Sequence, residues 1–280
     1  MVTHVGAFLR QRIVPALLGF VAFIGAAPSP DPGATPPVIQ QESSDVDETS
    51  PIQSWMLQTF YTSASYGPGN VRVLQIIPRF DTIRIGQSYA RVTLPRYQWI
   101  QGVGTGMGDS QLAYLFTNPI PSGRFGIGVN AYIPSASGPM QGIGTWGIGP
   151  AAAAVKFNAA SQTAIGFSIQ SLFSYAGPSN RVRQSAATFA PFFVKQLGSG
   201  WSLRSADAMW TFDFQRGSTL LPVSLGVGKL ITFGTHSLNV ALSDTVTVVH
   251  ANAPTLPKNT WKLAIRLMNL VGNPLAQLPH

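Results

Sequence analysis

Two short segments of the chain contain residue types that could do chemistry. The first, Gly108-Asp109-Ser110, places a serine beside an acid, as at the start of some serine-hydrolase motifs, although Gln111 stands where those motifs have an apolar residue. A nucleophilic serine needs a base within reach. The candidate bases are His236, which is next to Ser237, and His250. An enzyme that acts on lipids therefore stays open as an alternative.

The second segment, Gly142-Ile143-Gly144-Thr145-Trp146-Gly147, matches the glycine pattern of dinucleotide-binding loops. That fingerprint also requires a strand before it, a helix after it, and an acid about 20 residues later that binds the ribose. No Asp or Glu occurs between Asp109 and Asp207. We therefore interpret these glycines as a loop at a strand end and expect no cofactor.

Metal and carboxylate chemistry have little support. The four histidines are dispersed, and the chain has no cysteine, which excludes disulfides, thiolate metal sites and cysteine nucleophiles. Asp207 and Asp213 share one face of a predicted strand, but at about 3.3 Å per residue they lie roughly 20 Å apart. That separation is too large for a catalytic carboxylate pair. We expect no catalytic, cofactor or metal site.

The composition points to a membrane protein built from strands. The 280 residues are 45% hydrophobic but only 10% charged, whereas soluble domains are about a quarter charged. No apolar run long enough for a spanning helix follows the first thirty residues, and 28 Gly with 22 Pro argue further against a helical fold. A soluble β-sandwich is the competing interpretation, but its outer faces should carry many charges.

Alternation of apolar and polar residues begins near Trp55 and continues almost to the end of the chain. Side chains in a strand point to opposite faces at every residue, so alternation predicts strands with one apolar face. Eleven or twelve segments qualify, depending on whether the weak first one is counted: 55–65, 71–77, 88–94, 109–117, 124–133, 151–157, 162–175, 188–195, 207–215, 221–228, 238–249 and 261–268. The segment 151–157 is ambiguous, because its four alanines suit a helix equally well. Bacterial single-chain barrels have even strand numbers, so we favour twelve.

Residues at the two ends of the chain do not fit the barrel pattern. Residues 1–27 have a basic start, an apolar core and small residues at the end, which predicts a signal peptide. Residues 28–52 are rich in proline and acids and predict a disordered tail. We assign 53–270 to the barrel and 271–280 to a C-terminal tail. Barrel proteins commonly close on an aromatic residue that the insertion machinery recognises, whereas this chain ends in Leu278-Pro279-His280.

The charged residues of the strands fall on the polar face. A charge on the lipid face at mid-bilayer costs roughly 2–4 kcal/mol. The candidates for lining the lumen are Arg91, Arg124, Asp207, Asp213, Lys262 and Arg266, and a wider set adds Lys156, Arg204 and Asp244. These residues could be paired charges that fill a narrow barrel, or a filter that favours anions, because beyond residue 51 sixteen bases face five acids, a balance of +11.

The predicted strand at 124–133 gives the sharpest test of which residues face the lipid and which face the lumen. Ile127 belongs to its apolar face and Gly128 to its polar face. We expect Ile127→Arg to block assembly and Gly128→Ser to be tolerated in the lumen. Aromatic residues near strand ends would form the girdles at the two membrane interfaces. These are Trp99, Tyr132, Trp146, Tyr175, Trp201 and Trp261.

Short glycine-rich segments between about Val71 and Leu270 carry a family resemblance. They are Gly106-Met107-Gly108-Asp109, Gly147-Ile148-Gly149-Pro150, Pro191-Phe192, Gly200-Trp201-Ser202-Leu203, and Pro222 to Gly226 with Gly228 and Lys229. Their order and spacing resemble the outer-membrane family named for the meta-pathway of phenol degradation. The resemblance implies a barrel with a transport role for small hydrophobic or aromatic compounds, and it brings no catalytic residues.

The sequence as a whole predicts an all-β, transmembrane, antiparallel up-and-down barrel of about twelve strands in the outer membrane of a Gram-negative bacterium. The expected function is a passive conduit. A lipid-acting barrel enzyme and a plugged structural barrel remain the alternatives. Expected partners are membrane lipid, small solutes and the barrel-insertion machinery. Nucleic acid is not expected, because the basic residues are scattered singly along strands and do not form a patch.

Overall fold

The computed structural model describes residues 54–66, 69–85, 88–205, 208–233, 236–252 and 257–268. The predicted signal peptide, both predicted tails and Asp207 lie outside these residues. The described strands are β1 (Ser54–Tyr66), β2 (Gly69–Ile85), β3 (Ser88–Thr93), β4 (Tyr97–Ile100), β5 (Gly104–Met107), β6 (Ser110–Ile120), β7 (Gly123–Ile133), β8 (Trp146–Asn158), β9 (Thr163–Ala176), β10 (Ser185–Gly198), β11 (Trp201–Ser205), β12 (Trp210–Asp213), β13 (Ser218–Phe233), β14 (His236–Ala251) and β15 (Asn259–Met268).

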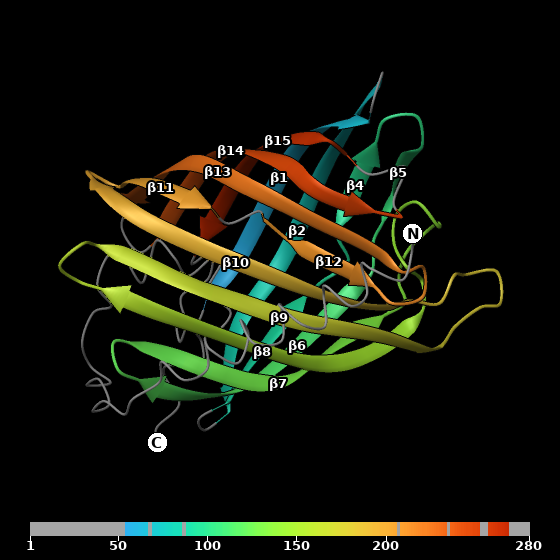
Figure 1. The fold of residues 1–280 in the computed structure, drawn as a ribbon, viewed down its shortest axis with the longest axis horizontal. Coiled ribbons are helices and arrows are strands. Elements are labelled where there is room, and N and C mark those ends of the chain that lie inside the picture. The colour runs from blue at the N-terminus through green and yellow to red at the C-terminus, as the bar shows by residue number, and fades with distance from the viewer. Residues whose placement is uncertain are drawn as a thin grey trace.

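The strands close into one antiparallel barrel, which confirms the predicted fold (Figure 1). Closure comes from β1, which pairs with both β2 and β15. Three positions in the wall are shared by two short strands each, namely β3 with β4, β5 with β6, and β11 with β12, so the barrel has twelve strand positions. No helix in the described part of the chain is long and apolar enough to cross a membrane.

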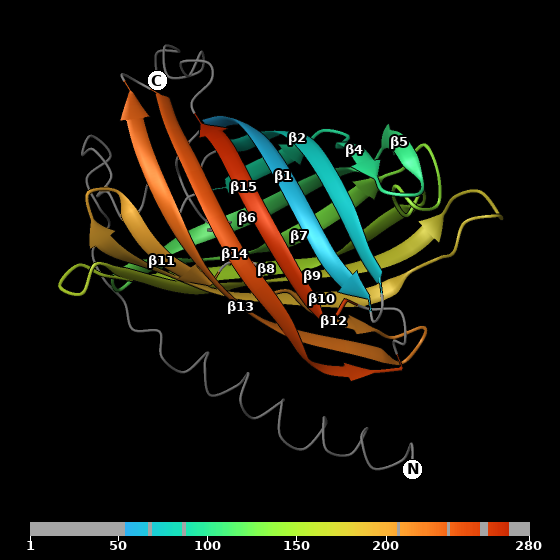
Figure 2. The same ribbon diagram turned by 90° about the horizontal axis from the view of Figure 1, so that it is seen from above.

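The two ends of the barrel differ in the length of their connections. At the short-turn end, residues 121–122, 159–162 and 199–200 join neighbouring strands. At the long-loop end, the connections 134–145 and 177–184 are the longest in the fully described wall. Figure 2 shows the loop between β7 and β8 beside β4 and β5 at this end. In an antiparallel barrel, alternate connections fall at opposite ends, so the three short turns share one end and the two long connections share the other.

The outer face of the wall is apolar. On β13, Val223, Leu225 and Val227 are 50%, 55% and 44% exposed, whereas Ser224 and Gly226 between them are buried. The same alternation runs through β6, where Leu112, Tyr114 and Phe116 are exposed, and through β14 and β15. A soluble domain does not expose so continuous an apolar surface. The soluble sandwich is therefore the wrong alternative.

Inward apolar side chains gather at the short-turn end. One cluster joins Val155, Ala164, Phe192 and Val194, and a second joins Met56, Leu230 and Met268. The ambiguous alanine segment belongs to β8, because hydrogen bonding to β7 and β9 makes it a strand. Ala151 and Ala153 face inward against Leu115, where their small side chains fit the crowded interior.

Most of the predicted girdle residues are on the outer face. Trp99, Trp146, Tyr175 and Trp261 are exposed near the long-loop end, and Trp201 is exposed at the short-turn end. Tyr132 is different, because it pairs with Gln111 and Gly147 on the inner face. The prediction that Tyr132 belongs to an aromatic girdle is therefore wrong.

Gly128 corrects a second expectation. It lies on the inner face of β7, as its phase predicts, but a Cβ atom there would come within 1.8 Å of the Tyr114 carbonyl oxygen on β6. A real Cβ atom never approaches a backbone oxygen so closely, so a serine would force the two strands apart. The expected tolerance of Gly128→Ser is therefore wrong, because β6 and β7 come too close together at this point.

Candidate functional site: the inner wall and its mouth

Basic side chains line the inner face of the barrel. Arg124 shares its face with buried Val155 on β8, and Arg91 shares its face with Ala113 on β6. On β15, Lys262 and Arg266 alternate with outward Trp261, Leu263 and Ile265. The inner bases of the described wall are Arg79, Arg91, Arg124, Arg204, Lys262 and Arg266.

The two described acids of the expected network, Asp213 and Asp244, do not lie among the inner bases. Asp213 belongs to the inner face of β12 but is the last residue of that strand, and its partners are in the turn that follows. Its Oδ2 accepts a hydrogen bond from Arg216 Nη1 at 3.1 Å, and its Oδ1 accepts hydrogen bonds from the backbone N–H groups of Gln215 and Arg216. Asp244 pairs with Leu225 and Trp261 and therefore faces outward. In the described part of the wall, neither Asp213 nor Asp244 is paired with an inner base.

Lys156 also departs from the expected set. It pairs with Gly123 and with exposed Ile165, which places it on the outer face three residues from the turn that follows β8. Lys195 and Lys229 occupy similar outward positions near the short-turn end. Lysines can bury their stems against an apolar surface while the ammonium group reaches water. These three lysines therefore mark the edge of the apolar outer band.

A buried polar row crosses β11, β14, β15 and β1. Arg204 is 3% exposed and extends along the wall over Gly228, so that its Nη1 donates to Asn239 Oδ1 at 3.3 Å. Asn239 is the register partner of Arg266, and Arg266 is the partner of Gln58. Sequence reasoning named the two arginines and missed Asn239 and Gln58, although both share the polar phase of their strands.

The mouth of the barrel at the long-loop end is organised by Asp109. Its Oδ1 accepts the backbone N–H groups of Ser135 and Ala136, both at 3.1 Å, and its Oδ2 accepts that of Gly144 at 3.0 Å. A Cβ on Gly142 would lie 2.5 Å from the same carboxylate. One acid thus holds both ends of the connection between β7 and β8, which we call the mouth loop (residues 134–145).

Gln141 of the mouth loop lies against the inner wall. Its side chain packs on Gly106, whose Cβ position is 2.7 Å from Gln141 Cγ, and its carbonyl oxygen accepts hydrogen bonds from the inward Gln98 and from Arg96. Gln98 in turn accepts from Gln75 Nε2 at 3.0 Å. The mouth loop therefore occupies space on the inner side of β4 and β5.

Removal of the Asp109 carboxylate is expected to loosen the mouth loop. Hydrogen bonds to a charged group are worth about 1.5–3 kcal/mol each, so an Asp109→Ala variant should lower the stability of the closed loop by a few kcal/mol. We expect a larger and noisier single-channel conductance in a planar bilayer. The control is Asn158→Ala, which removes one side-chain acceptor from the turn at the opposite end. Conductance traces of Asp109→Ala indistinguishable from those of the wild type would show that the loop does not narrow the mouth.

The structure separates the residues of the possible serine site. Ser110 lies at the long-loop end, where its Oγ contacts Ser135 Oγ at 3.2 Å, whereas His236 begins β14 at the short-turn end. His250 is exposed at the end of β14, on the far side of the strand order from β6. The dinucleotide-like glycines belong to the mouth loop and the start of β8, and a strand follows them where the fingerprint needs a helix.

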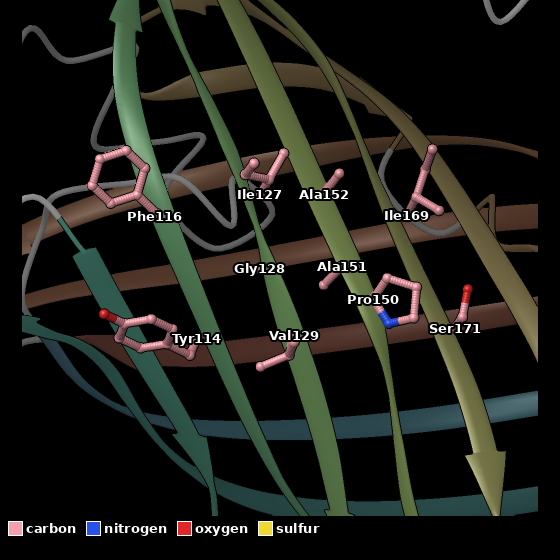
Figure 3. Close-up of a pocket in the computed structure, with 10 residues that line it drawn as sticks. All are labelled: Tyr114, Phe116, Ile127, Gly128, Val129, Pro150, Ala151, Ala152, Ile169 and Ser171. Carbon is pink, nitrogen blue, oxygen red and sulfur yellow. The ribbon is translucent and has the colours of Figure 1, made fainter.

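A shallow hollow on the outer wall lies over β6 to β9 (Figure 3). Tyr114, Phe116, Ile127 and Val129 project beside the smaller Pro150 and Ala152. These side chains belong to the apolar outer phase, so the hollow is separate from the inner wall.

Comparisons with known proteins agree with the barrel. The structure is similar to an outer-membrane channel of Pseudomonas putida F1, with a TM-score of 0.55, 13% sequence identity, and coverage of 86% of this chain and 99% of that one. It is also similar to the NanC porin, with a TM-score of 0.50, 7% identity, and coverage of 75% and 98%. These likenesses establish the fold. No family model matches the chain, and no curated protein matches it in sequence.

Proposed function

We propose that the protein is a passive outer-membrane channel whose interior favours anions and neutral solutes over cations. The observation that carries this proposal is the segregation of the two faces of the wall. The outer face is apolar around the barrel, and the described inner face carries six basic side chains. Fixed positive charge in a narrow, partly desolvated channel lowers the energy of an anion and raises that of a cation.

The ends of the barrel support an orientation in the membrane. Outer-membrane barrels have short periplasmic turns and longer extracellular loops. The short-turn end would then face the periplasm, with Trp201 and Lys229 at its interface, where Lys229 Nζ lies 5.0 Å from the Trp201 ring. The mouth loop would face the outside of the cell and meet solutes first.

The proposed solutes are small hydrophobic or aromatic compounds, as the family resemblance in the sequence implies. Two inner aromatic rings make cation–π contacts with basic side chains. Arg124 Cζ lies 5.0 Å from the centroid of the Phe157 ring, and Lys262 Nζ lies 4.8 Å from that of the Phe60 ring. Contacts between cations and rings are worth about 0.5–2 kcal/mol. An aromatic solute could replace one of these rings as the partner of a basic side chain. Such weak and reversible contacts along the wall are compatible with transport.

The reversal potential in a salt gradient tests the proposal. We expect the wild type to prefer chloride over potassium, and we expect Arg91→Gln and Lys262→Gln each to move the reversal potential toward zero, because each removes a positive charge from the inner wall. Lys156→Gln is the matched control, because it removes a charge from the outer face. A cation-selective pore would contradict the proposed selectivity, and purified protein that gives neither conductance nor liposome swelling would contradict the channel itself.

A further inference from the structure

Two arginines hold the mouth loop from neighbouring segments of the barrel rim. Arg96 lies between β3 and β4, and its Nη2 donates a hydrogen bond to the carbonyl oxygen of Gln141 at 3.3 Å. Arg181 lies in the connection between β9 and β10, and its Nη2 donates to the carbonyl oxygen of Ala136 at 3.2 Å. The mouth loop is therefore tied to two further segments, in addition to the hydrogen bonds that it makes with Asp109.

Both guanidinium groups pack closely against the backbone at the mouth. A Cβ on Gly108 would lie 2.5 Å from Arg96 Cγ, and a Cβ on Gly144 would lie 2.9 Å from Arg181 Cζ. Glycine at these two positions therefore leaves the room that the arginines occupy. Both arginines are nevertheless partly exposed, so small solutes that enter the mouth have access to them.

The loop carbonyls are modest partners for a charged donor. In the described part of the chain, neither guanidinium is paired with a carboxylate, and Arg96 Nε and Arg181 Nη1 are buried without an acceptor. Asp109, which holds the same loop, gives its oxygens to backbone N–H groups. A carboxylate matches the planar fork of a guanidinium with two parallel hydrogen bonds and is a stronger partner than one neutral carbonyl oxygen. An anionic solute therefore competes with the loop for either arginine.

We propose that carboxylate solutes open the mouth loop by taking Arg96 and Arg181 away from its carbonyl oxygens. A ligand shifts an equilibrium only when it binds one state better than the other. Here the full fork of each arginine is available to a carboxylate only after the loop has released it. Chloride opens the loop less, because a single atom does not match the fork. This inference rests on the proposed channel function and assigns the class of solute that opens its mouth.

Hydrogen–deuterium exchange of the full-length protein in detergent tests the opening without requiring a conducting pore. The backbone N–H groups that hold the loop closed are those of Ser135, Ala136, Ser137 and Gly144. Opening exposes them to exchange. The exchange rate of peptides from residues 134–145 is compared in acetate and in chloride at equal concentration and pH. We expect exchange roughly threefold to tenfold faster in acetate. Equal exchange of the wild type in the two salts would overturn the proposal.

Arg96→Gln and Arg181→Gln locate the effect of acetate. Each variant removes the charge that attracts a carboxylate, so each should lower the ratio of the exchange rates in acetate and chloride, and the double variant should abolish the difference. A variant that only loosens the loop, as expected for Asp109→Ala, should exchange faster in both salts and keep the ratio. Gel mobility before and after boiling verifies folding, and either single variant keeps the test available if the other does not fold.

The matched control is Arg216→Gln. Arg216 lies in a turn at the same end of the barrel, but its guanidinium is paired with Asp213 and holds no part of the mouth loop. Its substitution removes the same charge and should leave the ratio unchanged. A ratio that Arg216→Gln lowers as much as the mouth variants do would overturn the proposal, because acetate would then respond only to the net charge of this end.

The outcomes separate the loop from the channel. Faster exchange in acetate that the mouth variants remove, in a protein that conducts no ions, would support the anion-sensitive loop and contradict the channel. Conductance together with equal exchange in the two salts, or with a ratio that Arg96→Gln and Arg181→Gln leave unchanged, would overturn the loop proposal and leave the channel proposal standing.

Discussion

Ile127→Arg is expected to prevent most of the protein from assembling into a barrel. Ile127 lies near the middle of β7, is 53% exposed, and faces outward between Phe116 on β6 and Ala152 on β8. A side chain so exposed has room for arginine, so steric strain does not enter. The cost is electrostatic, because a guanidinium group at mid-bilayer is destabilising by about 2–4 kcal/mol. That is a large fraction of the roughly 5–15 kcal/mol by which domains are stable.

Gln111→Arg is the matched control for this variant. Gln111 pairs with Tyr132 on the inner face, and its Nε2 donates to Gln170 Oε1 at 2.9 Å. The substitution should lose about 1 kcal/mol for that neutral hydrogen bond while the new charge faces the lumen. After refolding into lipid vesicles, the fraction that migrates as a compact band without boiling measures assembly. Equal fractions for the two variants would mean that the outer face of β7 does not meet hydrocarbon.

Gly128→Ser is expected to destabilise the barrel severely even though position 128 faces inward. A Cβ there would lie 1.8 Å from the Tyr114 carbonyl oxygen and 2.8 Å from the Tyr114 carbonyl carbon. Backbone atoms cannot rotate away as a flexible side chain can, so β6 and β7 must separate. Overpacking in a tight interior costs about 1–3 kcal/mol and sometimes more. We expect the upper end of that range, because the hydrogen bonds between the two strands are strained as well.

The control for Gly128→Ser is Gly69→Ser, because a Cβ on Gly69 would have no atom within 4 Å. The urea midpoint of unfolding in lipid vesicles compares the two variants with the wild type. We expect Gly69→Ser to resemble the wild type and Gly128→Ser to unfold at a clearly lower urea concentration. A Gly128→Ser midpoint equal to that of the wild type would show that the two strands are further apart at this register.

The sequence by itself determined the class of fold, the number of strand positions and most of the strand phases. Each of these depends on a local property, because the direction of a side chain in a strand is set by its place in a two-residue repeat. For this reason the outward direction of Val223 and Leu225, and the inward direction of Arg124 and Lys262, could be predicted. Asp244 was also predictable, since it shares its parity with the outward Leu242 and Val246.

Only the tertiary structure decided which face a residue takes where the two-residue repeat is weak. It also decided which residues far apart in the chain come into contact. In 151–157 alanines occupy both phases, so only pairing with β7 and β9 places Lys156 outside. The role of Asp109 depends on N–H groups 26 to 35 residues away, and that of Gly128 depends on the distance to a neighbouring strand. The meeting of Phe60 with Lys262 and Arg266 depends on closure of the first strand against the last. Such contacts join residues far apart in the chain, and a local repeat holds no information about them.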